Sequence, residues 1–312
     1  MTRHIDEVPK WESIVDPSLV YKQSDNEICV TKIGSSTNYL ASQGIIPINH
    51  SHFGDVPRSH ADVGCYCEFM IQSIEAIART KLDADANTVF VLRDIKIDIM
   101  PDMRKIKRIH SGHTASIYFN RRQVRTDTNG RAYAIDGPAR CYINDIHAAD
   151  LHGTVAMFNP DTYATARGTP KAFHPHRKQR LPRPAPPEVG RTQSDNVLIE
   201  GVSITSKTAT GWLVSTQHPS YFDRPLDHYP GMMMAEASRQ LAVMLAHHCW
   251  EVSARELCTF RSELHFRMFA ELDSPPRIAA IINNAAENEI DIHILVDQDE
   301  QIIMNSCFVL GL

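Results

Sequence analysis

The sequence predicts an α+β fold in which one domain plan occurs twice. Three observations support this prediction: an internal repeat, an apolar helical segment in each half, and strand-like segments after each helix. The repeat consists of seven spaced residues that recur at a constant offset of 168 positions (228 − 60 and 236 − 68). Its members are His50, Phe53, Asp55, Pro57, His60, Glu68 and Gln72 in the first half, and His218, Tyr221, Asp223, Pro225, His228, Glu236 and Gln240 in the second.

Each repeat contains a segment rich in helix-forming residues, from 64 to about 80 and from 231 to about 248. Apolar side chains lie nearly all round the second segment, which is typical of a buried helix. Pro230 suits the first turn of that helix, and Asp227 is near enough in sequence to cap it. In the first repeat we expect Asp62 to be the cap.

Short strand-like segments surround each helix. An extended segment precedes each motif, at 28–33 and 212–216. After the first helix the strand-like segments are 116–119, 132–135 and 140–144, and Asn129-Gly130 is a strong hairpin signal between the first two. After the second helix they are 277–282, 290–296 and 302–309. One buried helix followed by an antiparallel meander is an α+β plan.

A stretch dominated by proline and basic residues separates the two repeats. We therefore expect a first domain at 1–166, an exposed linker at 167–194 and a second domain at 195–312. The linker carries a basic run, namely Lys171, Arg177, Lys178, Arg180 and Arg183. These side chains either attract an acidic partner protein or are simply solvated.

The overall composition argues for a soluble globular protein without nucleic-acid or membrane partners. The chain has 312 residues, of which 43% are apolar and 22% charged, and its net charge is −5. This charge gives no support for binding nucleic acid or an anionic membrane. No apolar run approaches the roughly 18 residues that a membrane-spanning helix needs. The first residues contain no signal-peptide pattern, so we expect a cytoplasmic location.

Neither the cysteines nor the paired histidines indicate a metal site. The chain has seven cysteines at irregular spacing, and Cys65 and Cys67 do not have the spacing of zinc or redox motifs. We expect reduced, mostly buried thiols. The histidine pairs, His110 with His113 and His174 with His176, lack partners at established metal-ligand spacing. The sequence therefore predicts neither a metal nor another cofactor.

The second copy of the motif concentrates the groups that could do chemistry. Glu236, Arg239 and Gln240 stand at i, i+3 and i+4, so they share one helix face. The Pro230-Gly231 helix start presents unpaired backbone N–H groups that suit a carbonyl or phosphate oxygen.

Two interpretations of these residues stay open. The Glu–Arg–Gln set is either part of an active site or a buried network that ties the helix to the sheet. The histidines at the helix entries (His60 and His228) and those at the start of each motif (His50 and His218) are either catalytic or structural hydrogen-bonding groups.

Residues 218–240 resemble the signature of the A-factor biosynthesis (AfsA-like) hotdog family, the bacterial γ-butyrolactone and butenolide signal synthases. The resemblance is strong there, moderate at 50–72 and weak elsewhere. It implies a tandem double hotdog, in which each domain is a long buried helix wrapped by a curved antiparallel sheet. It also implies that the two domains form an internal pseudo-dimer, present as a monomer or as a homodimer of the chain.

The resemblance further implies an acyltransferase. The expected reaction moves a β-ketoacyl group from a carrier-protein or CoA thioester to the hydroxyl of dihydroxyacetone phosphate or a similar small alcohol. The implied catalytic residues are Glu236, Arg239 and Glu68, and the implied substrate-binding residues are His228, Gln240, Gly231, His60 and Gln72. In this scheme a glutamate is the general base, and Arg239 either orients Glu236 or binds phosphate. The helix N-terminus polarises the thioester carbonyl.

The first copy departs from the family pattern. Ile71 stands where the family usually has an arginine, and Val63-Gly64 replaces the Pro-Gly start. Glu68 therefore either does chemistry or only supports the fold and lines a substrate tunnel.

Three further functions are compatible with such a fold. The first is dehydration of a hydroxyacyl thioester, but related dehydratases place a catalytic histidine fourteen residues before the glutamate, where this chain has Phe222 and Gly54. The second is hydrolysis of an acyl thioester. The third is acyl binding without catalysis.

Overall fold

The computed structural model describes residues 9–13, 16–45, 50–56, 63–104, 113–171 and 181–312. The chain forms two compact units, one of Met1–His50 with Cys65–Gly168 and the other of Ser51–Gly64 with Thr169–Leu312. The short segment 51–64, which lies in the first repeat of the sequence, therefore belongs to the second compact unit.

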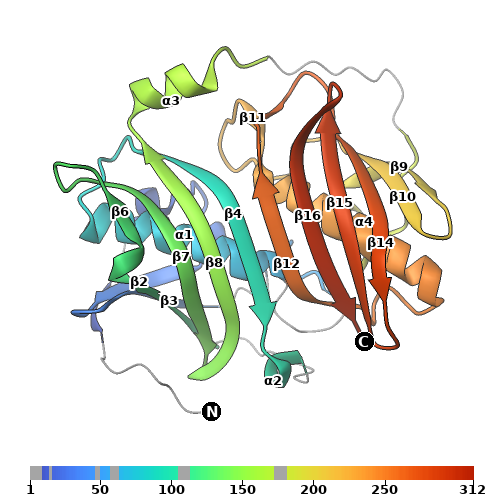
Figure 1. The fold of residues 1–312 in the computed structure, drawn as a ribbon, viewed down its shortest axis with the longest axis horizontal. Helices are drawn as coiled ribbons and strands as arrows, with labels where there is room; N and C mark the ends of the chain where they lie inside the picture. Colours follow the sequence, from blue (N-terminus) through green and yellow to red (C-terminus); the bar gives the residue numbers. More distant parts are fainter. Residues whose placement is uncertain (1–8, 14–15, 46–49, 57–62, 105–112, 172–180) are drawn as a thin grey trace. The chain divides into compact units, whose positions relative to one another are not determined.

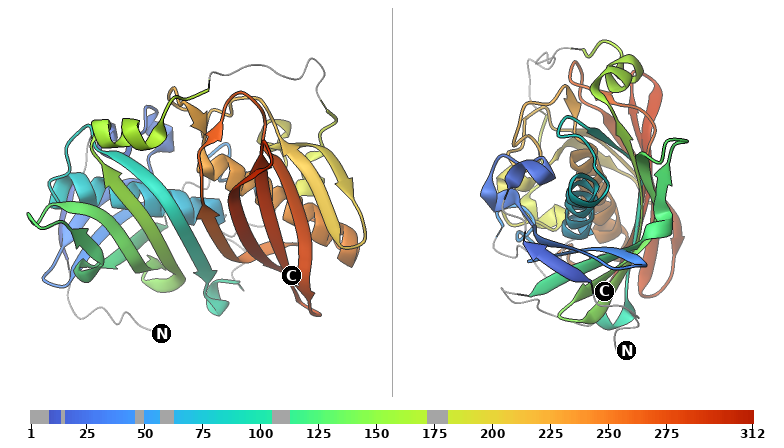
Figure 2. Two further views of the ribbon diagram at one scale, coloured as in Figure 1. Left: turned by 45° about the horizontal axis from the view of Figure 1, so that its top comes forward. Right: turned by 90° about the vertical axis from the view of Figure 1, so that its left-hand side faces the viewer.

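The first unit is a long helix, α1 (Val63–Lys81), with antiparallel strands curved round it (Figure 2). In sheet order the strands are β1 (Lys10–Ser13), β2 (Val30–Ser35), β3 (Tyr39–Ile45), β5 (Thr114–Asn120), β7 (Ala132–Ile143), β8 (Ile146–Phe158) and β4 (Val89–Ile99), and β6 (Val124–Thr126) pairs with β7. The short helices are η1 (Pro17–Val20), η2 (Asp25–Glu27), α2 (Pro101–Arg104), η3 (Arg121–Gln123) and α3 (Pro160–Arg167).

Helix α1 is buried because its apolar side chains press directly on the strands. Phe69 and Met70 are at most 1% exposed. A Cβ on Gly44 of β3 would lie 2.8 Å from the Phe69 ring, and one on Gly153 of β8 would lie 3.0 Å from Met70 Cε. The absence of side chains at these two glycines lets the helix approach the sheet closely.

The second unit repeats this plan with helix α4 (Gly231–Trp250), which lies behind its sheet in the view of Figure 1. In sheet order the strands are β12 (Cys258–Phe266), β16 (Gln301–Gly311), β15 (Glu289–Gln298), β14 (Arg277–Ala285), β10 (Thr208–Leu213) and β9 (Ile199–Ile204). The short elements are η4 (Pro186–Val189), η5 (Ser194–Asn196), and the paired strands β11 (His228–Tyr229) and β13 (Ala270–Glu271). Helix α4 packs against β10, β14, β15 and β16.

The predicted α+β plan is confirmed, as are both long helices and the three C-terminal strands. The turn at Asn129-Gly130 is also confirmed, with Gly130 at φ 79°, but it joins β6 to β7. The segments 132–135 and 140–144, expected as separate strands, form the single strand β7. Gly137 and Pro138 lie between the part of β7 that pairs with β6 and the part that pairs with β5. On that side no partner needs the N–H that proline lacks, so the strand continues through it.

The structure can be compared with the predictions about the cysteines, the linker and the lack of a membrane span. All seven thiols are free and five are buried, while Cys249 and Cys307 are partly exposed. Residues 172–180 of the expected linker, with His174 and His176, lie outside the described residues, as do Asp62 and His110. The end of the expected linker is not solvated throughout, because Arg191 is fully buried. No helix in the described part of the chain is long and apolar enough to cross a membrane.

Candidate active site

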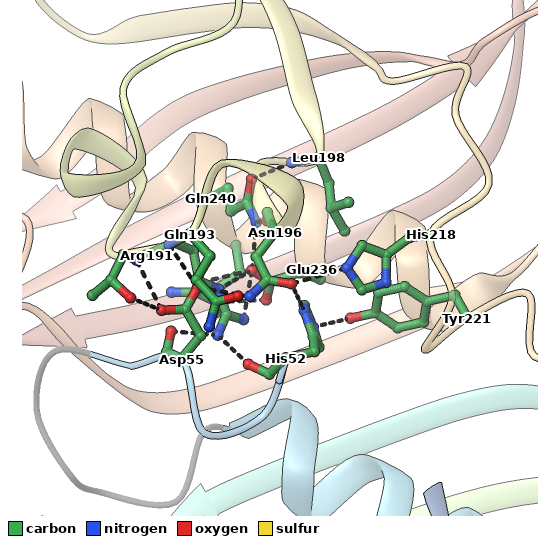
Figure 3. Close-up of polar contacts among 12 residues, drawn as sticks. His52, Asp55, Arg191, Gln193, Asn196, Leu198, His218, Tyr221, Glu236 and Gln240 are labelled. Atoms are coloured by element: carbon green, nitrogen blue, oxygen red, sulfur yellow. Dashed lines mark hydrogen bonds and ion pairs between the residues drawn. The ribbon is translucent and has the colours of Figure 1, made fainter. Parts of the chain in front are cut away.

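Helix α4 carries a buried ionic network in the second unit (Figure 3). The Glu236 side chain is 5% exposed. Its Oε2 accepts a hydrogen bond from Arg239 Nε at 2.7 Å, and its Oε1 accepts from Arg239 Nη2 and Gln240 Nε2, each at 2.7 Å. The sequence prediction that these three residues share one helix face is therefore confirmed.

A second arginine, Arg191, completes this network from the turn after η4. It follows Gly190, whose φ of 69° is in the left-handed region. Its Nε and Nη2 lie 3.0 and 2.7 Å from Glu236 Oε1. Its Nη1 donates to the backbone oxygens of His52 and Asp55 at 3.1 and 3.0 Å. One carboxylate thus faces five donor atoms, two of Arg191, two of Arg239 and one of Gln240.

The two guanidinium groups determine the protonation state of Glu236. Burial by itself would raise the pKa of this carboxyl, but the charges of Arg191 and Arg239 outweigh burial and hold the pKa well below its usual range. A carboxylate that is so strongly stabilised as an anion, with five donors on its oxygens, is a poor proton acceptor. The geometry therefore favours Glu236 as the residue that holds the two arginines in place, and it gives no support to a general-base role.

The segment 51–56 is tied to residues 191–196 by the Asp55 side chain. Asp55 Oδ1 accepts from the Thr192 backbone N–H at 2.9 Å and from the Thr192 hydroxyl. Asp55 Oδ2 accepts from the Gln193 N–H at 3.2 Å and from Asn196 Nδ2 at 2.7 Å. Burial would raise the pKa of Asp55, but the hydrogen bonds from Thr192 and Asn196 produce a net lowering.

Two buried histidines extend this network and are neutral in it. Asn196 Oδ1 accepts from His52 Nδ1 at 3.1 Å and from His218 Nε2 at 2.9 Å. His218 Nδ1 is an acceptor, because the Ser220 N–H donates to it at 3.2 Å. The Tyr221 hydroxyl lies 2.6 Å from His52 Nε2, and it donates there because burial holds the pKa of His52 well below 6.5 and keeps the ring neutral. These partners assign one tautomer to each ring. His218 is thus a buried hydrogen-bonding residue, which agrees with the structural one of the two interpretations given for it.

The network predicts how stability depends on pH. Burial, assisted by the Arg191 charge, lowers the pKa of His52 well below 6.5, so unfolding takes up a proton as the pH falls below that value. The wild-type free energy of unfolding should therefore fall between pH 6.5 and 5, and His52→Gln should reduce this slope by up to about 1.4 kcal/mol per pH unit. Urea unfolding at a series of pH values measures this dependence of the unfolding free energy on pH. The same change at His265, which is 41% exposed, should leave the slope as it is. An unchanged slope in His52→Gln would show that His52 stays protonatable in the folded protein.

The first unit contains a reduced version of this network. Lys22 Nζ lies 2.9 Å from Glu68 Oε1, and Gln72 Nε2 donates to the same oxygen at 2.7 Å. Gln72 Oε1 accepts from the backbone N–H of Cys29 at 2.8 Å, as Gln240 Oε1 accepts from that of Leu198 at 2.8 Å in the second unit. Within the described residues, two side-chain donors contact Glu68, whereas five contact Glu236. Ile71 stands where a second guanidinium would be.

The first turn of α4 has backbone N–H groups without a partner inside the helix. Pro230 is the N-cap and its carbonyl accepts from the N–H groups of Met233 and Met234 at 3.0 and 3.2 Å. The N–H groups of Gly231 and Met232 are therefore the ones left for a ligand at this terminus. A Cβ on Gly231 would lie 2.8 Å from the Phe266 ring, which explains a glycine at this position.

Asp227 does not cap α4, so that expectation was wrong. The N-cap is Pro230, and Asp227 Oδ1 instead lies 2.6 Å from His228 Nδ1. The His228 ring packs edge-on against Phe269 with 5.0 Å between centroids, and its side chain is 23% exposed. Asp227 thus fixes one ring nitrogen as a donor. The other, Nε2, has no hydrogen-bond partner among the described residues.

Of the predicted site residues of the second copy, Glu236, Arg239 and Gln240 contact one another, while Gly231 begins the same helix and His228 lies on β11 just before it. Glu68 and Gln72 form their own network in the first unit, and His60 lies outside the described residues. Sequence reasoning missed Arg191, Asn196 and His52. A usable signal for the first two existed, because the tetrapeptide Gln-Ser-Asp-Asn occurs at both 23–26 and 193–196, close after Lys22 and Arg191.

The architecture defines the class of protein as a hotdog-fold protein. A dehydratase domain of a trans-AT polyketide synthase from Brevibacillus brevis superimposes with a TM-score of 0.53 at 11% identity, covering 96% of this chain and 99% of that one. A hotdog-fold protein of unknown function from Alicyclobacillus acidocaldarius gives 0.52 at 10% identity, covering 95% and 98%. At such low identity these similarities show the fold alone, a double hotdog.

Residues 174–303 match the family model of the A-factor biosynthesis hotdog domain. Two curated relatives carry the same name, 2-oxo-3-(phosphooxy)propyl 3-oxoalkanoate synthase. The one from Streptomyces griseus is 29% identical over 155 residues, which are 46% of this chain and 48% of the relative. The one from Streptomyces virginiae is 37% identical over 133 residues, 41% and 42% of the two chains. The chain thus spans about half the length of the curated relatives it matches, and the predicted family resemblance is confirmed.

Proposed function

We propose that this protein transfers a 3-oxoacyl group from a thioester to the hydroxyl of dihydroxyacetone phosphate. The name of the curated relatives describes an ester of a 3-oxoalkanoate, and the alcohol that corresponds to its 2-oxo-3-(phosphooxy)propyl group is dihydroxyacetone phosphate. The observation that carries the proposal is the family match over 174–303, because this region contains Arg191, Glu236, Arg239 and the open start of α4. The acyl donor is a thioester of a carrier protein or of CoA.

The start of α4 would bind the thioester carbonyl. The Gly231 and Met232 N–H groups lie at the positive end of a 20-residue helix, where developing negative charge on oxygen is stabilised. The Glu236–Arg239 pair begins five residues after Gly231 and fixes the first turns of the helix against the segment that carries Arg191. We therefore propose Glu236, Arg239 and Gln240 as positioning residues for this terminus.

His228 is our proposed general base. It stands three residues before Gly231, its Nδ1 is held by Asp227, and its Nε2 is the available acceptor. In the proposed reaction Nε2 takes the proton of the alcohol as its oxygen attacks the thioester carbon. The tetrahedral oxyanion then re-forms the carbonyl and expels the thiolate, which takes the proton from His228. The products are the ester and a thiol, and no oxidant or cofactor is consumed.

The first copy has a supporting part in this proposal. Glu68 contacts a lysine and a glutamine, Ile71 stands at the position of the second guanidinium, and the helix that carries them lacks the Pro-Gly start. We propose that Glu68 and Gln72 stabilise the first unit. The ester itself would be a precursor of a butenolide, because the carbon between its two acyl carbonyls can condense with the ketone of the triose.

The proposal is tested by incubating the purified protein with a 3-oxoacyl thioester and dihydroxyacetone phosphate, followed by mass spectrometry. The expected product is the phosphorylated ester, formed in step with free thiol. Release of free 3-oxo acid at the same rate without the alcohol would instead identify a thioesterase. Unchanged substrates, with saturable binding of the acyl thioester, would identify an acyl-binding module.

The role of His228 makes a separate prediction. His228→Gln should lower kcat by about 100- to 10,000-fold, since it removes the proton acceptor, while the affinity for the acyl thioester stays nearly constant. Asp227→Asn should lower kcat less, because the imidazole remains but its orientation is no longer held by a carboxylate. Steady-state kinetics with both variants give the comparison. Equal kcat in His228→Gln and wild type would exclude His228 as the base.

A further inference from the structure

The solvent-facing side of the second unit's sheet carries three clustered side chains of types that can bind a metal ion. They are not part of the hydrogen-bonded network on α4. Asp291 and His293 lie on β15, and Cys307 lies on the neighbouring strand β16. Along β15 the alternate residues Ile290, Ile292 and Ile294 are at most 1% exposed, so Asp291 and His293 point to the opposite, outer face. His293 is directly opposite Cys307 in the strand register. All three side chains therefore share one face of two paired strands.

The distances within this cluster suit a tetrahedral ion. Cys307 Sγ lies 2.9 Å from Asp291 Oδ1, and His293 Nε2 lies 3.7 Å from the same carboxylate oxygen. The three ligand atoms all lie within 4.8 Å of one another. Bond lengths of about 2.0–2.3 Å to zinc place neighbouring ligand atoms of a tetrahedral site roughly 3.3–3.7 Å apart. Small rotations of exposed side chains are enough to reach that geometry.

The chemistry of the three side chains selects the class of ion. A thiolate and an imidazole exclude Mg²⁺ and Ca²⁺ as preferred ions, because these take oxygen ligands. One sulfur, one nitrogen and one oxygen ligand suit Zn²⁺ or Co²⁺. The S–H of Cys307 donates a hydrogen bond to Asp291 Oδ1. Replacement of this proton by a divalent cation gives a thiolate and a carboxylate, which together neutralise the ion.

Neighbouring side chains orient the carboxylate and place a further acid beside the cluster. Glu263 on β12 is directly opposite Cys307 on its other side and has a 36% exposed side chain. Asp291 Oδ2 is held by Asn283 Nδ2 at 2.9 Å, and Asp291 Oδ1 accepts from the thiol. The cluster thus has an oriented carboxylate and an acidic neighbour on the adjoining strand.

We propose that Asp291, His293 and Cys307 form a binding site for a tetrahedral divalent transition-metal ion that links β15 to β16. In the cell this ion would be Zn²⁺. The site belongs to the outer face of the sheet and does not depend on the proposed acyl transfer. An ion bound there stabilises the folded second unit, because the unfolded chain does not hold the three ligands together.

Titration of the metal-free, reduced protein with Co²⁺ tests the site. We expect one equivalent of Co²⁺ to produce a thiolate-to-cobalt charge-transfer band and the intense visible bands of tetrahedral cobalt, and Zn²⁺ to displace both. Cys307→Ser should abolish the charge-transfer band, and His293→Gln should weaken binding at least tenfold. Cys249→Ser is the matched control, because Cys249 is the other partly exposed thiol and lies outside the cluster. Absence of the band in the wild-type protein, or its persistence in Cys307→Ser, would overturn the proposal.

Discussion

Replacing Arg191 by methionine should destabilise the second unit by about 3–5 kcal/mol, the cost typical of breaking a buried ion pair by removing one partner. Arg191 is fully buried and donates both to Glu236 and to the backbone oxygens of His52 and Asp55. Methionine fills much of the volume but leaves these acceptors without a donor. Urea unfolding, followed by the fluorescence of the second unit's tryptophans, Trp212 and Trp250, measures the loss.

Lys22→Met is the matched control for this prediction. Lys22 holds the same kind of contact to Glu68 in the first unit, but its side chain is 12% exposed, whereas that of Arg191 is 0% exposed. Water reaches the lysine and relieves part of the loss, so we expect less than half the effect of Arg191→Met. Equal losses in the two variants would show that the deeper burial of Arg191 and its additional hydrogen bonds do not increase the cost of removing the cation.

Glu236→Gln should lower the rate of ester formation by at least about 100-fold. The change keeps the shape of the side chain but leaves Arg191 and Arg239 buried without their shared counter-ion. Both guanidinium groups and the first turns of α4 will then shift, and a displacement of about 1 Å at the carbonyl-binding terminus is enough for such a loss. The measurement is product formation by mass spectrometry at a temperature at which circular dichroism shows the variant to be folded.

Glu68→Gln provides the comparison. Because Glu68 belongs to the weaker network of the first unit, we expect its rate of ester formation to stay within a few-fold of wild type. Equal losses in Glu68→Gln and Glu236→Gln would show that the two copies contribute alike to the reaction. A protein that keeps its full biological role with Glu236→Gln would instead be a non-catalytic acyl-binding module.

The fold was largely predictable because it depends on local patterns that occur twice. The helices α1 and α4 follow from runs of helix-forming residues, with apolar residues nearly all round α4, and β15 begins with isoleucine at alternate positions. The strand β7 was predicted in two pieces, which lie on either side of Gly137 and Pro138. Only the sheet shows that this pair falls where one neighbouring strand has ended and the next has not begun.

The site was predictable as far as contacts within one helix. Spacing alone put Glu236, Arg239 and Gln240 on one face, and the structure confirms that they contact one another. The spacing did not indicate the second arginine, because Arg191 is 45 positions away in sequence and lies in a proline-rich stretch that has the composition of a linker. It likewise did not indicate His52, which contacts Tyr221 across 169 positions.

By itself, the sequence determined the duplicated α+β plan, the family resemblance and the Glu–Arg–Gln face of α4, since each depends on residues that are close in the chain or repeated at a fixed offset. The tertiary structure alone decided what surrounds that face. It brings Arg191 onto Glu236 and the segment 51–56 onto Arg191, and the two positive charges favour the anionic form of the carboxyl. Whether a buried carboxylate takes up protons depends on the charges packed round it, and those come from parts of the chain that no local pattern connects.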